Sequence, residues 1–164
     1  MPTATYTPIA TQTLGSAAAS ITFSSIPGTY TDLRLVLTCT TSSAGSVVYV
    51  KFNADSTTTN YSFVNLYGQG SSTGATAGVN SLIAINAFLG TSTSISQMYS
   101  ADIFSYAGST NKCVIGTCAE DQNGSGDVTI TQGLWRSTAA ITSVVLSLSA
   151  GNFSTGTIAT LWGI

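Results

Sequence analysis

The chain has 164 residues, a length that suits one domain and allows a buried core. Only 6% of the residues are charged, far below the usual share of about 25%, and the net charge is −2 with four cationic residues in all. This balance argues against nucleic acid and against an anionic membrane surface as partners, because both need clustered Lys or Arg. A surface so poor in charge favours a subunit that packs against neighbours, the alternative being a monomer kept soluble by its hydroxyl groups.

Apolar and polar residues alternate along most of the chain, which predicts strands and no helix. In 46–53, Val48, Val50 and Phe52 share one face, and in 141–149 the face opposite the apolar residues carries serines. One apolar face and one hydroxyl face are typical of antiparallel sheets covered on a single side. The sequence therefore predicts an all-β fold, an antiparallel β-sandwich that is jelly-roll-like, in a single domain over 1–164. The expected strands are 4–14, 18–24, 32–41, 46–53, 61–67, 81–89, 97–107, 111–119, 127–135, 141–149 and 156–163.

The segments between these strands carry turn chemistry. "IPGT" at 26–29 has Pro and Gly at the positions that a type II turn prefers. Residues 53–60 are predicted to form a loop, and 68–78, poor in apolar residues, a mobile surface loop. Residues 121–127 combine Asn-Gly and Ser-Gly and predict a hairpin connection. Residues 1–16 are extended and nearly uncharged, and we interpret them as an arm that pairs with an edge strand of a neighbour.

The residues that enzymes use are scarce, and we predict no catalytic, cofactor-binding or metal-binding residue. The sequence has no His, which removes the Ser-His and Cys-His nucleophile arrangements. Lys51 and Lys112 lack the neighbours of a lysine base and are interpreted as solvated strand lysines. A glycosidase would need two carboxylates, and the candidates are Asp32, Asp55, Asp102, Glu120, Asp121 and Asp127. All except Asp102 fall at strand ends or in turns, where acidic residues usually cap the backbone.

Asp102 lies within a predicted strand, so its carboxylate needs a partner there. Arg34 and Arg136 are the two candidates, and a structural ion pair is the expectation.

A calcium site at 121–127 is the one metal hypothesis that the sequence leaves open. Asp121, Asn123 and Ser125 recur at every second residue and are followed by Gly126, as at the start of a calcium loop, and Asp127 adds a further oxygen ligand. The residue at the place of the closing Glu is Gln132, and no helix is predicted beside the loop. We favour a hairpin turn without metal.

Aromatic residues and cysteines each allow two interpretations. Trp135 beside Arg136 is either an exposed interface anchor or a plug at one end of the sandwich, with Arg136 bonding loop carbonyls or a carboxylate. The seven tyrosines are either a carbohydrate platform or strand residues with hydroxyls at the rim. Cys113 and Cys118, five residues apart, point to opposite faces of a strand, and with Cys39 we expect three buried free thiols. The tyrosines are Tyr6, Tyr30, Tyr49, Tyr61, Tyr67, Tyr99 and Tyr106.

Several stretches in order resemble a known family. They are "FSSIPGTYTDLRLVL" (23–37), "VKFNADSTTTNYSFVNLYGQG" (50–70), "ADIFSYAGSTNK" (101–112) and "GLWRSTAAITSVVLSLSAGNFSTGTIATLWGI" (133–164). These look like a β-rich virion domain of tailed bacteriophages, common in phages of aquatic bacteria and cyanobacteria. Thr157 and Trp162 stand where the family pattern has Ser and Tyr. The resemblance implies a jelly-roll-like sandwich, surface display and trimeric assembly, and it brings no catalytic residues.

We therefore expect a structural virion protein without enzymatic activity or cofactor. It would be a decoration or cement protein on the outer surface of the head, made in the host cytoplasm. Its expected partners are the major capsid protein and further copies of itself, as a homotrimer, with no nucleic acid and no membrane. The chain reaches its first predicted strand directly after Met1, which favours this interpretation over a long fibre. The alternative is a tail-fibre or baseplate tip that binds a host glycan, with aromatic residues such as Tyr67 and Trp135 along a groove.

Overall fold

The computed structural model describes residues 5–86, 92–121 and 126–164. The described residues form twelve strands in two antiparallel sheets and contain no helix. They therefore include no helix that is long and apolar enough to cross a membrane. The all-β class and the antiparallel sandwich predicted from the alternation are confirmed. The strands are β1 (Thr7–Thr13), β2 (Ser20–Phe23), β3 (Leu33–Cys39), β4 (Val48–Phe52), β5 (Tyr61–Gln69), β6 (Ser72–Asn80), β7 (Ile83–Ala84), β8 (Gln97–Phe104), β9 (Lys112–Asp121), β10 (Gly126–Trp135), β11 (Val144–Leu148) and β12 (Ile158–Gly163).

The order of the strands makes the sandwich jelly-roll-like. The large sheet runs β1-β12-β3-β8-β9-β10-β5-β6, and the small sheet runs β2-β11-β4-β7. β3 pairs with β12 in the large sheet, β4 pairs with β11 in the small sheet, and β5 pairs with β10 in the large sheet. Two antiparallel halves of the chain thus wrap together across both sheets, which is the jelly-roll arrangement.

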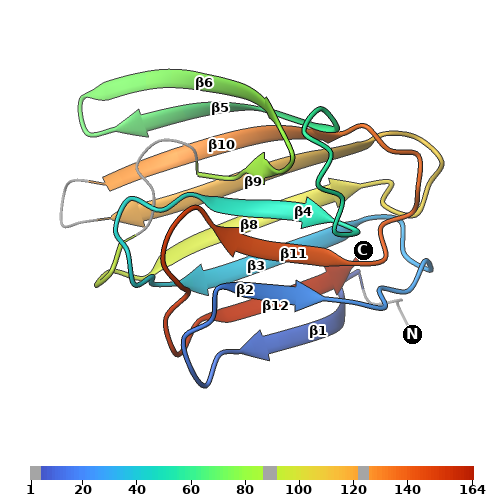
Figure 1. Cartoon of the computed structure of the whole chain (residues 1–164), viewed down its shortest axis with the longest axis horizontal. Helices are drawn as coiled ribbons and strands as arrows, with labels where there is room; N and C mark the ends of the chain where they lie inside the picture. Colours follow the sequence, from blue (N-terminus) through green and yellow to red (C-terminus); the bar gives the residue numbers. More distant parts are fainter. Residues whose placement is uncertain (1–4, 87–91, 122–125) are drawn as a thin grey trace.

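The two sheets differ in size, and the small one covers only part of the large one. Figure 1 looks onto the small sheet, with β5 and β6 of the large sheet extending beyond it. The core between the sheets comes from the expected alternation, for example Leu33, Leu35 and Leu37 on β3 against Val50 on β4. Burying this apolar surface is the main stabilising term, at about 25 cal/mol per Å².

An aromatic cluster closes one end of the core. Tyr61 and Trp135 stack with ring centroids 6.1 Å apart, and Phe52 lies 5.5 Å from Trp135. The Tyr61 hydroxyl lies 3.1 Å from both the amide nitrogen and the carbonyl oxygen of Phe52. This cluster fixes the start of β5 and the end of β10 relative to β4.

The segment expected as a mobile loop at 68–78 is the main correction to the predicted elements. Residues 72–80 form β6, which pairs with β5 along its whole length. A Cβ at Gly74 would collide with the ring of Tyr67, and one at Gly78 would lie 3.0 Å from Phe63 Cζ. The rings therefore cover the two glycines, and aromatic cover with backbone pairing replaces the apolar side chains that the inner side of β6 lacks.

Other differences from the expected elements are local. The strand expected at 81–89 is reduced to β7, and 87–89 lie outside the described residues. The turn at 26–29 is not type II, since the left-handed residue nearby is Ser25 (φ 55°) and Gly28 does not have positive φ. The Tyr106 hydroxyl donates to Pro27 O and accepts from the Tyr30 amide, so a buried side chain shapes this turn.

The segment expected as an arm toward a neighbour is part of the large sheet. Its residues 7–13 form β1, which pairs with β12 of the same chain. The alternating pattern in this segment is therefore satisfied within the molecule.

Candidate functional site: the outer face of the large sheet

Two adjacent strands of the large sheet have their polarity reversed. On β10, Val128 and Ile130 are exposed, whereas Thr129 and Thr131 are buried. On β5, Val64 and Leu66 are exposed, whereas Asn65 is buried. Alternation normally turns the aliphatic residues inward, so the aliphatic residues of these strands face the unusual way, while Tyr61 and Phe63 of β5 still face the core.

The aromatic cluster explains the reversal. Trp135 shares its side of β10 with Thr129 and Thr131, because strand residues two apart face the same way. Burying Trp135 beside Phe52 and Tyr61 therefore turns Val128 and Ile130 to the outside. The large aromatic side chains outweigh the smaller aliphatic ones in setting the orientation of both strands.

The exposed aliphatic side chains form a contiguous group. Ile130 lies directly across from Leu66, and Val64 lies across from Gln132, whose other neighbour is Ile115 on β9. We call Val64, Leu66, Val79, Ile115, Val128 and Ile130 the outer patch, and each is between 47% and 64% exposed. Single exposed apolar residues are ordinary, but a contiguous group on one sheet face marks an interaction surface.

Two of the four strands that carry the outer patch, β5 and β6, contain no charged residue. No charged residue occurs in the sequence from 56 to 101, which includes β5 and β6. On β3 and β8, beyond the patch, Arg34 and Asp102 form a two-pronged ion pair, with Nε–Oδ1 and Nη2–Oδ2 distances of 2.8 Å. The hydrogen bond to Asp102 raises the pKa of Arg34. Of the two arginines considered for Asp102, Arg34 is thus the partner.

The outer side of the small sheet has the opposite character. It presents Ser20 and Thr22 on β2, Ser147 on β11, and Tyr49 and Lys51 on β4. The outer patch and the hydroxyl-rich side of the small sheet thus lie on opposite sides of the sandwich. The rest of the outer face of the large sheet is polar, with the Arg34–Asp102 ion pair and the hydroxyl pairs Ser100–Thr117 and Thr11–Thr160.

Polar side chains lie buried behind the outer patch. Asn65 on β5 has Thr131 of β10 and Thr76 of β6 as its direct cross-strand neighbours. The amide of Asn65 and both threonine hydroxyls are buried and have no hydrogen-bond partner among the described residues. Unpartnered buried polar atoms reduce stability, so this reversed region is not optimised for folding alone.

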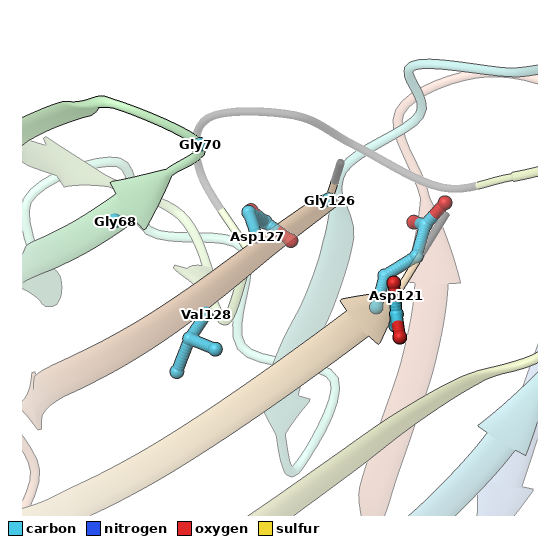
Figure 2. Close-up of a pocket in the computed structure, with 7 residues that line it drawn as sticks. Gly68, Gly70, Asp121, Gly126, Asp127 and Val128 are labelled. Carbon is cyan, nitrogen blue, oxygen red and sulfur yellow. The ribbon is translucent and has the colours of Figure 1, made fainter. Parts of the chain in front are cut away.

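An open hollow of about 320 Å³ lies at one end of the outer patch, where the β5–β6 turn meets the ends of β9 and β10. Figure 2 shows Asp127 and Val128 pointing to opposite sides of β10 beside this hollow. Asp127 is buried and lies across from Glu120, which is also buried. Burial raises the pKa of Asp127, and a 3.4 Å hydrogen bond from Thr129 opposes this shift.

The structure brings three of the six candidate carboxylates together at this end: Glu120, Asp121 and Asp127. Asp121 and Asp127 point to opposite faces of the sheet, one exposed and one buried. Asn123 and Ser125, the other ligands of the calcium hypothesis, lie outside the described residues. The described ranges contain no group of three His, Cys, Asp or Glu side chains able to hold a metal ion.

The remaining two carboxylates serve local structure. Asp55 accepts hydrogen bonds from Asn60, Trp135 and the Thr57 amide, and these bonds lower its pKa, the Asn60 bond having the largest effect. Asp32 accepts one from the Ser105 amide at 2.6 Å.

The interpretation of Lys112 as a solvated lysine is wrong. Lys112 is completely buried, and its Nζ donates to the carbonyls of Gly108, Thr110 and Ser137 at 2.7, 2.5 and 3.4 Å. Burial lowers its pKa. Lys112 thus joins the 105–111 connection to the segment after β10. Lys51 is partly exposed and bonds Ser56, as expected for a strand lysine at the surface.

The structure decides between the two interpretations of Trp135 and Arg136. Trp135 is buried and acts as the plug, and Arg136 donates to Thr59 O and Ser62 Oγ. Trp135 is therefore not available to line a groove on the surface, and the Tyr67 ring lies against Gly74.

The tyrosines and cysteines are distributed through the fold. Tyr61, Tyr99 and Tyr106 are core residues. Cys39 and Cys118 are buried free thiols, and burial raises the pKa of each to about 12. Cys113 is exposed, so its expected burial is wrong, although it and Cys118 do point to opposite faces.

Comparison with known proteins gives a fold likeness and no family. No family model matches the chain, and no curated protein matches it. The galectin LEC-6 of Caenorhabditis elegans is similar over 90% of this chain and 91% of its own, at 12% identity and a TM-score of 0.34. Alginate lyase Aly36B is similar over 92% of this chain and 78% of its own, at 8% identity and a TM-score of 0.34. A mutant of that lyase with alginate tetrasaccharide is similar at 9% identity, over 94% of this chain and 79% of its own, with a TM-score of 0.31. These likenesses are too distant to carry an argument about function.

Sequence reasoning missed the outer patch because it assigned every apolar alternation to the core. The signal that would have revealed the patch is the position of Trp135 in the alternation of β10, on the same side as Thr129 and Thr131. A strand that places Trp on the same side as its threonines must expose its aliphatic residues if the Trp is buried.

Proposed function

We propose that the protein is a structural virion protein, a decoration or cement protein that binds the major capsid protein on the outside of a tailed phage head. The observation that carries the proposal is the outer patch on β5, β6, β9 and β10. The resemblance of residues 23–37 and 133–164 to phage virion domains supports the choice of partner.

The outer patch and the outer side of the small sheet suit the two environments of a decoration protein. The outer patch lies against the capsid, where its aliphatic side chains lose contact with water. The hydroxyl-rich side of the small sheet faces the solution. A protein that binds only the assembled shell stabilises that shell by mass action, without any chemical step.

The test uses phage heads that lack the protein, to which recombinant protein is added before sedimentation. The double variant Leu66→Asp/Ile130→Asp places two carboxylates on a cross-strand pair of the outer patch. We expect binding at least roughly tenfold weaker than wild type, because charges are depleted in interface cores. Thr22→Asp, on the exposed side of the small sheet, is the matched control and should bind like wild type.

Imaging of complete particles provides the second measurement. Hundreds of copies on the head are expected. A few copies confined to the tail, or full binding of the double variant to heads, would reject the proposal.

A further inference from the structure

β6 is a long edge strand that lacks the usual protection against pairing. Its nine residues contain no charge and no Pro, and its register with β5 runs from Asn80 to Ser72 without a bulge. Proteins normally protect such an edge with Lys, Pro, bulges or short strands, because unpaired backbone groups attract another strand.

The other edges within the described residues are protected in these ways. β1 carries Pro8 and a register shift between Pro8 and Ala10. In the small sheet the edges are β2, of four residues, and β7, of two. The contrast singles out β6, and we propose that two copies of this chain associate through β6, antiparallel and related by a two-fold axis at Thr76. This inference does not depend on the proposed function.

The sequence of β6 is suited to pairing with itself. Around Thr76 it reads Thr-Gly-Ala-Thr-Ala-Gly-Val, nearly the same in both directions. An antiparallel two-fold contact needs this symmetry, because each residue meets its mirror position in the other copy. Gly74 then lies across from Gly78, Ala75 across from Ala77, and Thr73 across from Val79. Head-to-tail pairing would instead need β1 as the second edge, which is protected.

The backbone groups point the right way for this register. Gln69 and Ser72 flank a two-residue turn in which Gly70 has φ 52°, so they form a hydrogen-bonded pair with each other. Bonding alternates along an antiparallel strand, and the odd-numbered residues 73–79 therefore direct N–H and C=O to the open edge. In the proposed register, residue 73 of one copy faces residue 79 of the other and residue 75 faces residue 77, so these pairs form backbone hydrogen bonds. The two Thr76 residues face each other as a non-hydrogen-bonded pair.

Side chains on the inner side support the same contact. Thr76 lies on the axis, so the Thr76 side chains of the two copies face each other, an arrangement in which threonines bond across strands. The rings of Phe63 and Tyr67 cover Gly78 and Gly74. Because these glycines face each other across the axis, Phe63 of one copy meets Tyr67 of the other.

The experiment compares two double variants of the whole protein by sedimentation equilibrium over a dilution series. Ala75→Lys/Ala77→Lys places like charges opposite each other in both pairs, and Ala75→Lys/Ala77→Glu places opposite charges there. Both side chains are exposed, so thermal unfolding should show that the two variants fold equally well. We expect a wild-type dimer of twice 16.7 kDa and a dissociation constant about tenfold higher for the Lys/Lys variant than for the Lys/Glu variant.

Each other outcome overturns the proposal. A wild-type monomer excludes the contact, and a wild-type trimer, as the phage resemblance implies, excludes the two-fold arrangement. Equal dissociation constants for the two variants show that Ala75 and Ala77 do not face each other.

Discussion

The indole nitrogen of Trp135 donates a 2.8 Å hydrogen bond to Oδ2 of Asp55, linking the end of β10 to the loop after β4. Asp55→Ala leaves this buried donor without its partner, and we expect a loss of about 1–3 kcal/mol in the free energy of unfolding. Urea denaturation at pH 7 measures it.

The same carboxylate makes stability depend on acid. Its pKa is lowered in the folded state, chiefly by the Asn60 hydrogen bond. Its contribution is therefore present above the unfolded pKa of about 3.9 and is lost as pH falls below it. The Asn side chain of Asp55→Asn does not titrate. Between about pH 5 and pH 2, a range that brackets the unfolded pKa, the free energy of unfolding should therefore fall less for Asp55→Asn than for wild type. An equal fall in the free energy of unfolding of the two proteins over this pH range would contradict the prediction.

Asp127 should make stability depend on pH in the opposite direction. Burial raises its pKa, so the folded state favours the protonated form, and its contribution declines as pH rises through the folded pKa. Asp127→Asn should therefore be more stable than wild type at neutral pH, with the difference shrinking in acid. A variant less stable than wild type at neutral pH would show that the Asp127 charge is needed in the fold.

Lys112→Met keeps the aliphatic volume but leaves the carbonyls of Gly108 and Thr110 without their donor. We expect a loss of about 2–4 kcal/mol, measured by thermal unfolding. Lys51→Met is the matched control, since Lys51 is partly exposed, and should change stability by less than about 0.5 kcal/mol. Equal effects of the two substitutions would reject the structural role of Lys112.

Thr131→Val removes a buried hydroxyl that has no partner among the described residues and keeps the shape of the side chain. We expect a gain of about 1 kcal/mol in the free energy of unfolding. Thr129, whose hydroxyl donates to Asp127, is the control, and Thr129→Val should not give this gain. A destabilised Thr131→Val protein would point to an ordered water on that hydroxyl.

Ala54 has φ 53°, a conformation that is strained for a residue with a Cβ. Ala54→Gly should stabilise the protein by about 0.5 kcal/mol, the relieved strain exceeding the extra flexibility of the unfolded chain. Ala54→Val should destabilise it, because a branched Cβ tolerates this conformation least. Thermal unfolding of both variants checks the order.

The fold class was predictable because alternation in strands such as β3 and β4 follows directly from burial on one side. The position of β6 was not predictable, since its glycines are covered by Phe63 and Tyr67 from the neighbouring strand and not by residues of its own. The burial of Lys112 depends on carbonyls at Gly108 and Ser137, which only the folded chain brings together.

The outer patch was hidden for a related reason. Leu66 and Ile130 carry the same alternation as core residues, and only the placement of Trp135 between the sheets reveals that they face outward. Local pattern thus predicts that a strand has two unlike sides, while the long-range aromatic cluster decides which side is buried.

The late strand β12 lies between β1 and β3, so the earliest strand reaches the large sheet only through a segment more than 140 positions downstream. During synthesis, β1 leaves the ribosome early and stays unpaired until β12 has been made. Such distant pairing slows folding and leaves an apolar intermediate open to association with other chains. The yield of folded protein on expression should therefore depend on chaperones and on temperature more strongly than the stability of the finished sandwich would suggest.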